Sequence, residues 1–405
     1  MDNIKSIDKD RLFQEIDKII DWVIEVRRDF HMNPELGMEE FRTNKKITEY
    51  LTYMGVEYKS PVAKTGVLGL ISGRKKSLNN IKTIALRADM DALPIFEENK
   101  VSYRSTKDGI MHACGHDAHM AVLLGTAKIL KSLENEFDGN IKLIFQPAEE
   151  TVGGAKPMIE EGVMENPKVD AIFGLHMAPE IEKGKIGIRY GKNNASSDTI
   201  KIIVSGESTH GAYPHSGIDA IAISAQIINS IQTIVSRSIA PLNSAVVTIG
   251  TINGGNRPNI IADKVEMIGT IRTLDEETRT LVLKRIKSMV ENIAESMGGK
   301  GELVLEEGYT ALINDNSMVD LVRNNAEYVI GTENIKVIEH PSLGVEDFAY
   351  FLKEAKGAFF RLGCRNEEKG IVHDGHHKLF DIDEESLKYG IAIQVLNVLS
   401  ILGDS

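Results

Sequence analysis

Met111-His-Ala-Cys-Gly-His-Asp-Ala-His119 leads directly into a long apolar stretch, residues 117–134, whose spacing predicts a helix. Cys114 and His116 are two residues apart. We interpret the segment that holds them as extended, so that both side chains project to the same side. A thiolate and an imidazole together favour zinc or a neighbouring divalent transition metal. The run therefore predicts a metal site just before a helix.

Strand and helix patterns alternate along the first half of the chain. Apolar residues recur at helical spacing over residues 8–30, which predicts an amphipathic helix. Short β-branched runs then predict strands at residues 66–71, 83–86, 141–145 and 171–175. We therefore expect an α/β fold with a mostly parallel sheet covered by helices.

Polar residues follow three of the four predicted strands. Asp89 and Asp91 come after the second strand, and His176 directly follows the fourth. Glu149 and Glu150 come after the third. Open α/β sheets hold their sites beyond the carboxyl ends of the strands, so we expect these side chains to share a site with Cys114 and His116.

The paired acids allow a division of roles. Neighbouring side chains point in different directions, so one of Glu149 and Glu150 can bind metal while the other acts as a base, as metal-assisted hydrolysis requires. Two adjacent acids are otherwise a common feature of solvated surfaces. Asp89 and Asp91 can orient a ligand histidine through a hydrogen bond, or they form a structural turn.

Other candidates near the motif have structural interpretations. Asp117 is interpreted as the N-cap of the helix that follows. His112 and His119 are interpreted as supporting or structural residues rather than ligands. Three histidines in the carboxyl-terminal part compete for one ligand role, and spacing alone does not choose among them: His373, His376 and His377.

After about residue 190 the pattern changes. Its order is strand, helix, two strands, helix and strand, at residues 198–205, 217–235, 245–252, 264–272, 276–297 and 302–306. This β-α-β-β-α-β order predicts a second domain inserted at residues 190–308. Residues 1–189 and 309–405 then form one discontinuous domain.

The run Ser208-Thr-His-Gly-Ala-Tyr-Pro-His215 follows the first strand of the predicted insert and precedes its first helix. His210 or His215 can donate a hydrogen bond to an oxyanion that develops during a reaction. The alternative is a turn whose polar groups cap the chain. The residues of the run do not decide between the two.

Composition excludes several classes of protein. A chain of 405 residues is long enough for two domains. A formal net charge of −12 opposes nucleic-acid binding, and no run approaches 18 uninterrupted apolar residues, so we expect no membrane span. The only two cysteines cannot form a disulfide framework, and Cys364 lies in an apolar run that predicts a buried strand. We expect a cytoplasmic protein.

Five motifs together resemble the amidohydrolase branch of the dinuclear metallopeptidases. They are Met111–His119, Phe145-Gln-Pro-Ala-Glu-Glu150, Gly174-Leu-His176, Gly211-Ala-Tyr-Pro-His215 and Gly344-Val-Glu-Asp-Phe348. The branch includes hippurate hydrolases, auxin-conjugate hydrolases, N-acyl-amino-acid amidohydrolases and N-acetyldiaminopimelate deacetylases. The resemblance extends from Asn33-Pro-Glu-Leu-Gly37 to Phe380.

The resemblance implies two divalent transition metal ions, Zn, Mn, Co or Ni, bridged by Cys114. His116 and His176 would complete one metal site, and Glu150 and His376 the other. His376 is preferred to His377 because the ligand of this family stands four residues before a large apolar residue, here Phe380. The family often has proline two residues after that histidine, where this chain has Lys378.

The resemblance also implies catalytic and substrate-binding roles. Glu149 would be the general base. We also count Asp91, identified above from its position after a strand, among the catalytic residues. The inserted domain would act as a lid that supplies His210, often to the partner subunit's site. The exposed edges of its four-stranded sheet also predict a dimerisation surface. Asn259 and Arg272 would lie near the substrate. The implied reaction is hydrolysis of the amide bond of small N-acyl-L-amino acids.

Three alternatives stay open. Gly153-Gly-Ala-Lys-Pro-Met158 and the pair His376-His377 also resemble the N-acetyldiaminopimelate deacetylases of lysine biosynthesis. A thiol hydrolase would use Cys114 as nucleophile and His116 as base. A metal-dependent binding protein with a degenerate site is the non-enzymatic alternative, and the intact Glu149 weighs against it.

Overall fold

A computed structural model describes residues 7–75 and 81–403 and contains an eight-stranded sheet. The chain divides into two units. The first comprises Met1–Gly191, Asn314–Glu339 and Tyr350–Ser405, and the second comprises Lys192–Ile313 and His340–Ala349. The predicted insert at 190–308 overlaps the main segment of the second unit, Lys192–Ile313, and the second unit also contains the separate segment His340–Ala349.

The sheet of the first unit has the strand order β1-β2-β4-β3-β5-β14-β6-β13. Its four neighbouring strands β4, β3, β5 and β14 are parallel, as the sequence predicts, whereas β1 and β2 pair antiparallel. The strands are β1 (Glu57–Val62), β2 (Gly66–Ser72), β3 (Thr83–Asp89), β4 (Asn140–Gln146), β5 (Ala171–Glu182), β6 (Ile186–Ile188), β13 (Ile335–Val337) and β14 (Lys356–Arg365). Cys364 is buried in β14, as expected, and is a free thiol.

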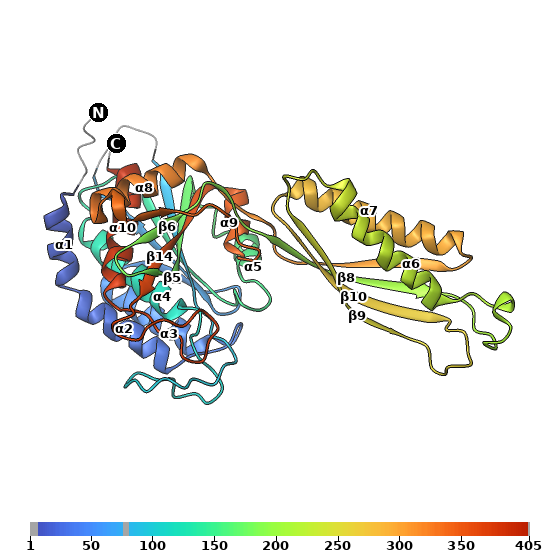
Figure 1. The fold of residues 1–405 in the computed structure, drawn as a ribbon. Coiled ribbons are helices and arrows are strands. Elements are labelled where there is room, and N and C mark those ends of the chain that lie inside the picture. Colours follow the sequence, from blue (N-terminus) through green and yellow to red (C-terminus); the bar gives the residue numbers. More distant parts are fainter. Residues whose placement is uncertain (1–6, 76–80, 404–405) are drawn as a thin grey trace. The chain divides into compact units, whose positions relative to one another are not determined.

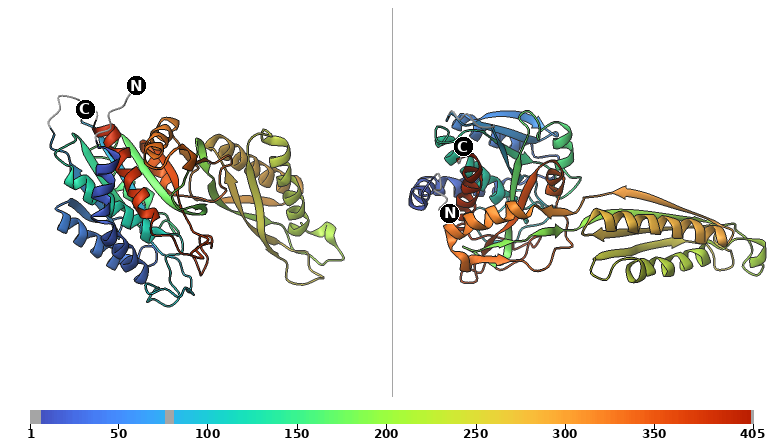
Figure 2. Two further views of the ribbon diagram at one scale, coloured as in Figure 1. Left: turned by 60° about the vertical axis from the view of Figure 1, so that its left-hand side comes forward. Right: turned by 90° about the horizontal axis from the view of Figure 1, so that it is seen from above.

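Helices cover this sheet in layers (Figures 1 and 2). Helices α4 and α10 pack side by side against the strands, and α1 and α2 pack outside them. Helix α4 is buried along most of its length, because its sequence is apolar on nearly all sides. The helices are α1 (Lys9–Asp17), α2 (Ile20–Met32), α3 (Phe41–Met54), α4 (His116–Ser132), α5 (Ala155–Glu160), α8 (Asn316–Ile330), α9 (Phe348–Glu354) and α10 (Ser386–Leu402).

Two elements differ from the sequence prediction. The helix expected over residues 8–30 is two helices, because a tight turn, in which the Ile19 N–H donates to the Ile16 carbonyl, separates α1 from α2. Strand β5 does not end at Leu175 but continues to Glu182. Its pairing with β3 stops at Gly174, yet β14 remains beside it as a parallel partner. His176 therefore lies within a strand rather than beyond its end.

The second unit has the predicted β-α-β-β-α-β order. Its elements are β8 (Ser196–Ser205), α6 (Ala220–Thr233), β9 (Ala245–Gly254), β10 (Lys264–Thr273), α7 (Glu276–Ser296) and β11 (Lys300–Glu307). The antiparallel sheet has the order β11-β8-β10-β9, so β9 and β11 are its edges. Helices α6 and α7 pack on one face through a separate apolar core (Figure 1). A short two-stranded sheet, β7 (Gly191–Asn194) with β12 (Leu312–Asn314), lies where the chain passes between the units.

Short helical turns complete the described chain. They are η1 (Pro214–Ser216), η2 (Ile234–Ser238) and η3 (Thr332–Asn334). Within residues 7–75 and 81–403, no helix is long and apolar enough to cross a membrane.

Candidate metal centre

The Cys114 backbone lies in a turn, not in the extended segment expected from the sequence. Helix α4 begins at His116, and Gly115 between the two residues has a φ of 90°. This left-handed conformation is one that glycine adopts readily. A Cβ atom on Gly115 would also lie 2.9 Å from Cγ of Met177. The tight turn, rather than a strand, places the thiol and the imidazole beside each other.

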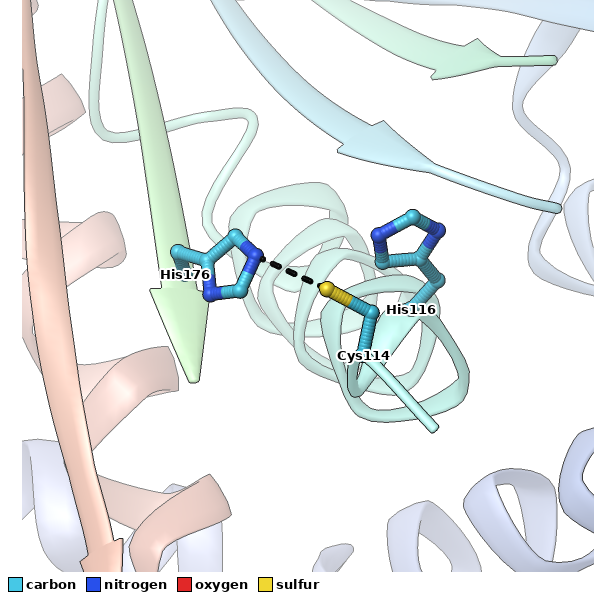
Figure 3. Close-up of side chains that lie close together, drawn as sticks. All are labelled: Cys114, His116 and His176. Carbon is cyan, nitrogen blue, oxygen red and sulfur yellow. Dashed lines mark hydrogen bonds between the residues drawn. The ribbon is translucent and has the colours of Figure 1, made fainter. Parts of the chain in front are cut away.

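His116 and His176 both present Nε2 to the site (Figure 3). A carbonyl oxygen only accepts, so Nδ1 of His116, 2.8 Å from the Asp91 carbonyl, and Nδ1 of His176, 2.7 Å from the Met177 carbonyl, carry the ring protons. The Nε2 atoms of both rings are therefore unprotonated, and their lone pairs point away from these carbonyl groups. Nε2 of His176 lies 3.4 Å from Sγ of Cys114, and Nε2 of His116 is buried with no hydrogen-bond partner among the described residues.

Glu150 and His376 form a second group around the same cysteine. Nε2 of His376 lies 3.1 Å from Oε1 of Glu150, and one donor atom each from Cys114, Glu150 and His376 lie within 4.8 Å of one another. The His376 N–H donates to the Ala113 carbonyl at 2.7 Å, which ties this segment to the residue before Cys114. His376 has a φ of 63°, and strained backbone of this kind is concentrated at functional sites.

Buried carboxylates hold the turn that carries Glu149 and Glu150. Asp91 accepts the Glu149 N–H at Oδ1, at 3.0 Å, and the Glu150 N–H at Oδ2, at 2.9 Å. Glu40 accepts the Ala148 N–H at 2.8 Å. Three successive backbone N–H groups are thus fixed by two side chains. Asp91 is recognisable from the sequence, whereas the only sequence signal of Glu40 is its position three residues after Gly37.

The two adjacent acids differ in their neighbours. Glu150 forms one group of possible donors with Cys114 and His376 and another with His116 and Glu149. Among the described residues, no group of three or more joins Glu149 to Cys114. Glu149 is 8% exposed. The geometry therefore favours Glu150 over Glu149 as a partner of the thiol.

Asp89 and His119 form a hydrogen-bonded pair, and together with His116 they make a further group of possible donor atoms. Nε2 of His119 accepts the Met177 N–H at 2.9 Å, so its Nδ1 carries the proton that it donates to Asp89 at 2.5 Å. Burial alone raises the pKa of Asp89, but Arg87, 2.6 Å away, holds that pKa well below its usual range. With both nitrogens engaged, His119 has no lone pair for a metal. This agrees with its interpretation as a supporting residue.

The remaining candidates of the first unit belong to none of the donor groups that contain Cys114. His373 and His377 stack on each other with ring centroids 4.4 Å apart, and Nδ1 of His377 accepts the Leu379 N–H. Asp117 does not cap α4: its carboxylate binds Arg27 and His31 inside the core. His112 is buried beside the same core. Of the three competing histidines, the structure brings only His376 to Cys114.

The donor set fits divalent transition metal ions. Sulfur, imidazole nitrogen and carboxylate oxygen converge, and the buried Nε2 of His116 lacks a partner among the described residues. A nucleophilic thiolate is poorly supported here. Burial, and then the neighbouring Glu150, raise the pKa of the Cys114 thiol well above its usual range, opposite to the shift that activates a catalytic cysteine.

The candidate residues of the second unit lie at two separate positions within that unit. His210 and Asn259 are exposed and adjacent: His210 forms a bridge with Ile260, and the Gly211 N–H donates to the Asn259 carbonyl at 2.8 Å. Nδ1 of His210 accepts the Ala212 N–H at 3.0 Å, so Nε2 carries its proton. Arg272 is on β10, paired with Val246 of β9.

Comparison with known proteins identifies relatives of the whole chain. A profile described as Peptidase family M20/M25/M40 matches residues 85–399. Thermostable carboxypeptidase 2 of Saccharolobus solfataricus is 42% identical over 96% of this chain and 97% of its own. N-acetyl-L-cysteine deacetylase of Bacillus subtilis is 41% identical over 90% of this chain and 84% of its own. The crystal structure of a dinuclear metal-binding peptidase of the M20 family, also from Bacillus subtilis, has a TM-score of 0.82 and 34% identity, covering 95% of this chain and 99% of that one.

Replacing Cys114 tests the shared ligand. We expect Cys114→Ala to lose most bound metal while keeping its fold, because only Cys114 belongs to both groups of donors. Cys364→Ala is the matched control, since it removes the other cysteine from the core of β14 without touching the site. Elemental analysis and circular dichroism measure the two effects. Two metal ions per chain in Cys114→Ala would contradict the assignment.

Proposed function

The chain belongs to peptidase family M20/M25/M40 and is a metal-dependent amidohydrolase, and we propose that it cleaves the amide bond of small N-acyl-L-amino acids. The observation that supports this most is the pair of donor groups that share Cys114, with the Glu149 carboxylate beside them. A site with two sets of metal ligands and an additional carboxylate meets the needs of metal-assisted hydrolysis.

We assign the ligands as follows. One cation would be held by Cys114 with His116 and His176, and the other by Cys114 with Glu150 and His376. The chemistry that a bound cation pair supplies is activation of a water molecule and polarisation of the substrate carbonyl. Asp91 is a positioning residue in this assignment. Its carboxylate fixes the Glu149–Glu150 backbone, and its Oδ1 lies 3.3 Å from Nδ1 of His116.

Glu149 moves the proton. Its carboxylate takes a proton from the attacking water, whose oxygen forms a bond to the amide carbon. The carbon–nitrogen bond then breaks, and Glu149 gives the same proton to the departing amine nitrogen. The products are a carboxylic acid and a free amino acid. Glu149 is left as it began, so the proton balance closes.

The relatives suggest which side of the amide is recognised. The names of two relatives, a thermostable carboxypeptidase and an N-acetyl-L-cysteine deacetylase, both describe cleavage of an amide whose nitrogen belongs to an amino acid with a free carboxylate. We therefore propose that this carboxylate is the common feature of the substrates. Arg272 is our candidate for binding it, because a guanidinium pairs with a carboxylate in two-pronged geometry.

Glu149→Gln tests the base. We expect metal content like that of the wild type and a rate lower by about two orders of magnitude or more, because the amide cannot accept the proton. The assay uses N-acetyl, N-benzoyl and indole-acyl amino acids and N-acetyldiaminopimelate, each with Mn, Zn, Co and Ni. Loss of metal from the variant would mean that Glu149 and Glu150 exchange roles. No turnover of any substrate by metal-loaded wild type would favour the binding-protein alternative.

Arg272 and the His210–Asn259 pair lie at opposite ends of the second unit's sheet. Lys264 begins β10 and Arg272 is its ninth residue, so at about 3.3 Å per residue they lie roughly 26 Å apart. Asn259 precedes Lys264 by five residues, on the side away from Arg272. A small substrate cannot contact both places of one rigid unit. If all three residues serve one site, they come from two subunits.

An uncharged surface supports a dimer through this unit. Residues 220–256 contain a single charged residue, Arg237, whereas a chain that is 26% charged would place about ten in such a stretch. The stretch includes α6 and the edge strand β9, whose second half is exposed. The other edge, β11, carries Lys300, Glu302 and two further glutamates, which discourage strand pairing.

Strand pairing about a two-fold axis explains how the second subunit contributes. Two β9 strands would pair antiparallel, which sets Gly254 of one subunit beside Ala245 of the other. Gly254 lies near the His210 end of the sheet, because it pairs with Val265, and Ala245 lies near Arg272. The dimer would therefore bring His210 of one subunit towards the Arg272 end of its partner. The Nε2–H of His210 is then the donor that we assign to the oxyanion.

Mixing two inactive variants tests catalysis across the subunit boundary. We expect His210→Ala to lose rate strongly while keeping its metal. When it exchanges subunits with Glu149→Gln, activity should return, because one hybrid site then holds both groups. Absence of recovery despite demonstrated exchange would place His210 in its own subunit's site or outside catalysis.

A charge on the edge strand tests the interface. Ile252 on β9 is 51% exposed and Val304 on β11 is 43% exposed, so they are matched edge positions. We expect Ile252→Lys to convert a dimer to monomers, because in the proposed register each lysine would lie opposite Val247 of the partner subunit and bring a charge into an otherwise uncharged strand pair. Val304→Lys should remain dimeric. Light scattering after size exclusion measures both, and a dimeric Ile252→Lys or a monomeric wild type would contradict the proposed interface.

A further inference from the structure

Arg27 of helix α2 lies fully buried at the centre of an ion-pair network in the first unit. Its Nε donates to Oδ2 of Asp117 at 2.7 Å, and its Nη2 donates to Oδ1 of Asp381 at 2.9 Å. Its Nη1 lies 3.4 Å from Oε1 of Glu384. One guanidinium thus joins three carboxylates from two distant segments of the chain.

Each of these segments carries candidate metal ligands. Asp117 directly follows His116 and lies three residues after Cys114, in the first turn of α4. Asp381 lies five residues after His376. Between them the chain is restrained: the Phe380 N–H donates to the His377 carbonyl at 2.9 Å, and Asn99 donates to the Phe380 carbonyl at 2.8 Å. A displacement of Asp381 would therefore be passed to His376.

Other buried groups hold the network itself. His31 lies between two carboxylates, with Nδ1 2.8 Å from Asp117 and Nε2 3.2 Å from Glu97. The Tyr103 hydroxyl donates to Oδ2 of Asp381 at 2.7 Å. Each carboxylate that Arg27 binds at Asp117 and Asp381 therefore has a second donor that limits its position.

We propose that Arg27 is a positioning residue that sets the spacing between the two cation sites. One arm of its guanidinium holds the segment that presents Cys114 and His116, and the other holds the segment that presents His376. This inference rests on the ligand assignment of the proposed function. It adds that the second site, completed by Glu150 and His376, depends on a side chain that touches neither metal nor substrate.

The chemistry of arginine suits this task. Its planar fork binds two carboxylates in fixed directions, whereas the single ammonium of lysine acts as a point charge. Burying ion pairs is costly, and a buried pair often adds no net stability over apolar residues of similar size. The groups that support metal ligands, by contrast, typically change metal affinity by about 10-fold to 100-fold when they are replaced.

Arg27→Lys, in the full-length protein, tests the proposal by stepwise titration of metal-free protein with Co²⁺. Calorimetry measures both binding steps, and the thiolate-to-cobalt absorption reports occupancy at Cys114. We expect the first step to keep an affinity close to that of the wild type, and the second to weaken about tenfold or more. Asp381→Asn removes the charge of one arm only and should weaken the same second step. If Arg27→Lys does not fold, Asp381→Asn still tests the proposal.

Arg279→Lys is the matched control. Arg279 binds Asp198 through two nitrogens, at 2.8 and 2.7 Å, in the second unit, so its replacement lowers stability without reaching the metal ligands. If Arg27→Lys and Asp381→Asn bind Co²⁺ in two steps with wild-type affinities and only their melting temperatures fall, the network is merely structural. A wild type that does not bind two cations would instead overturn the ligand assignment. The two failures are thus distinguishable.

Discussion

The carboxylate of Asp91 is the constraint on which the candidate site depends. It follows β3 in sequence, yet its two oxygens accept the backbone N–H groups of Glu149 and Glu150, which follow β4. The Asp91 carbonyl also accepts the Nδ1 proton of His116, at the start of α4. A single residue therefore fixes the acidic turn and one imidazole relative to each other. Since it is buried, no water competes for these hydrogen bonds.

Around Asp91 the fold brings together side chains whose burial is unfavourable in the absence of a metal ion. Burial and the nearby carboxylates disfavour ionisation of the Cys114 thiol, and the buried Nε2 of His116 has no partner among the described residues. A divalent cation would offset the cost of ionising the thiol, because it binds the thiolate. It would also satisfy the unpaired Nε2, because it accepts the imidazole lone pair. These donor groups therefore suit divalent ions, and beside them His119 joins Asp89 to the Met177 N–H, next to His176.

The second unit poses a different physical question, since its candidate residues lie at the two ends of one sheet. The contrast between its edges is informative: β9 is uncharged, whereas β11 carries lysine and glutamates. An uncharged edge strand is a template for pairing with another chain. Antiparallel pairing of two β9 strands would bring His210 of one subunit towards Arg272 of the other, so that the two subunits share one site.

Local pattern determined much of this protein. The spacing of apolar residues predicted the strands and helices of both units, and the types of side chain after each strand predicted a metal site with Cys114, His116, His176 and a paired acid. Tertiary structure decided what depends on neighbours far along the chain. It extended β5 past His176 because β14 lies beside it, brought His376 rather than His377 to Cys114 through Ala113, and enlisted Glu40 and Arg27. Periodicity encodes which face of an element is buried, but not which distant group that face will meet.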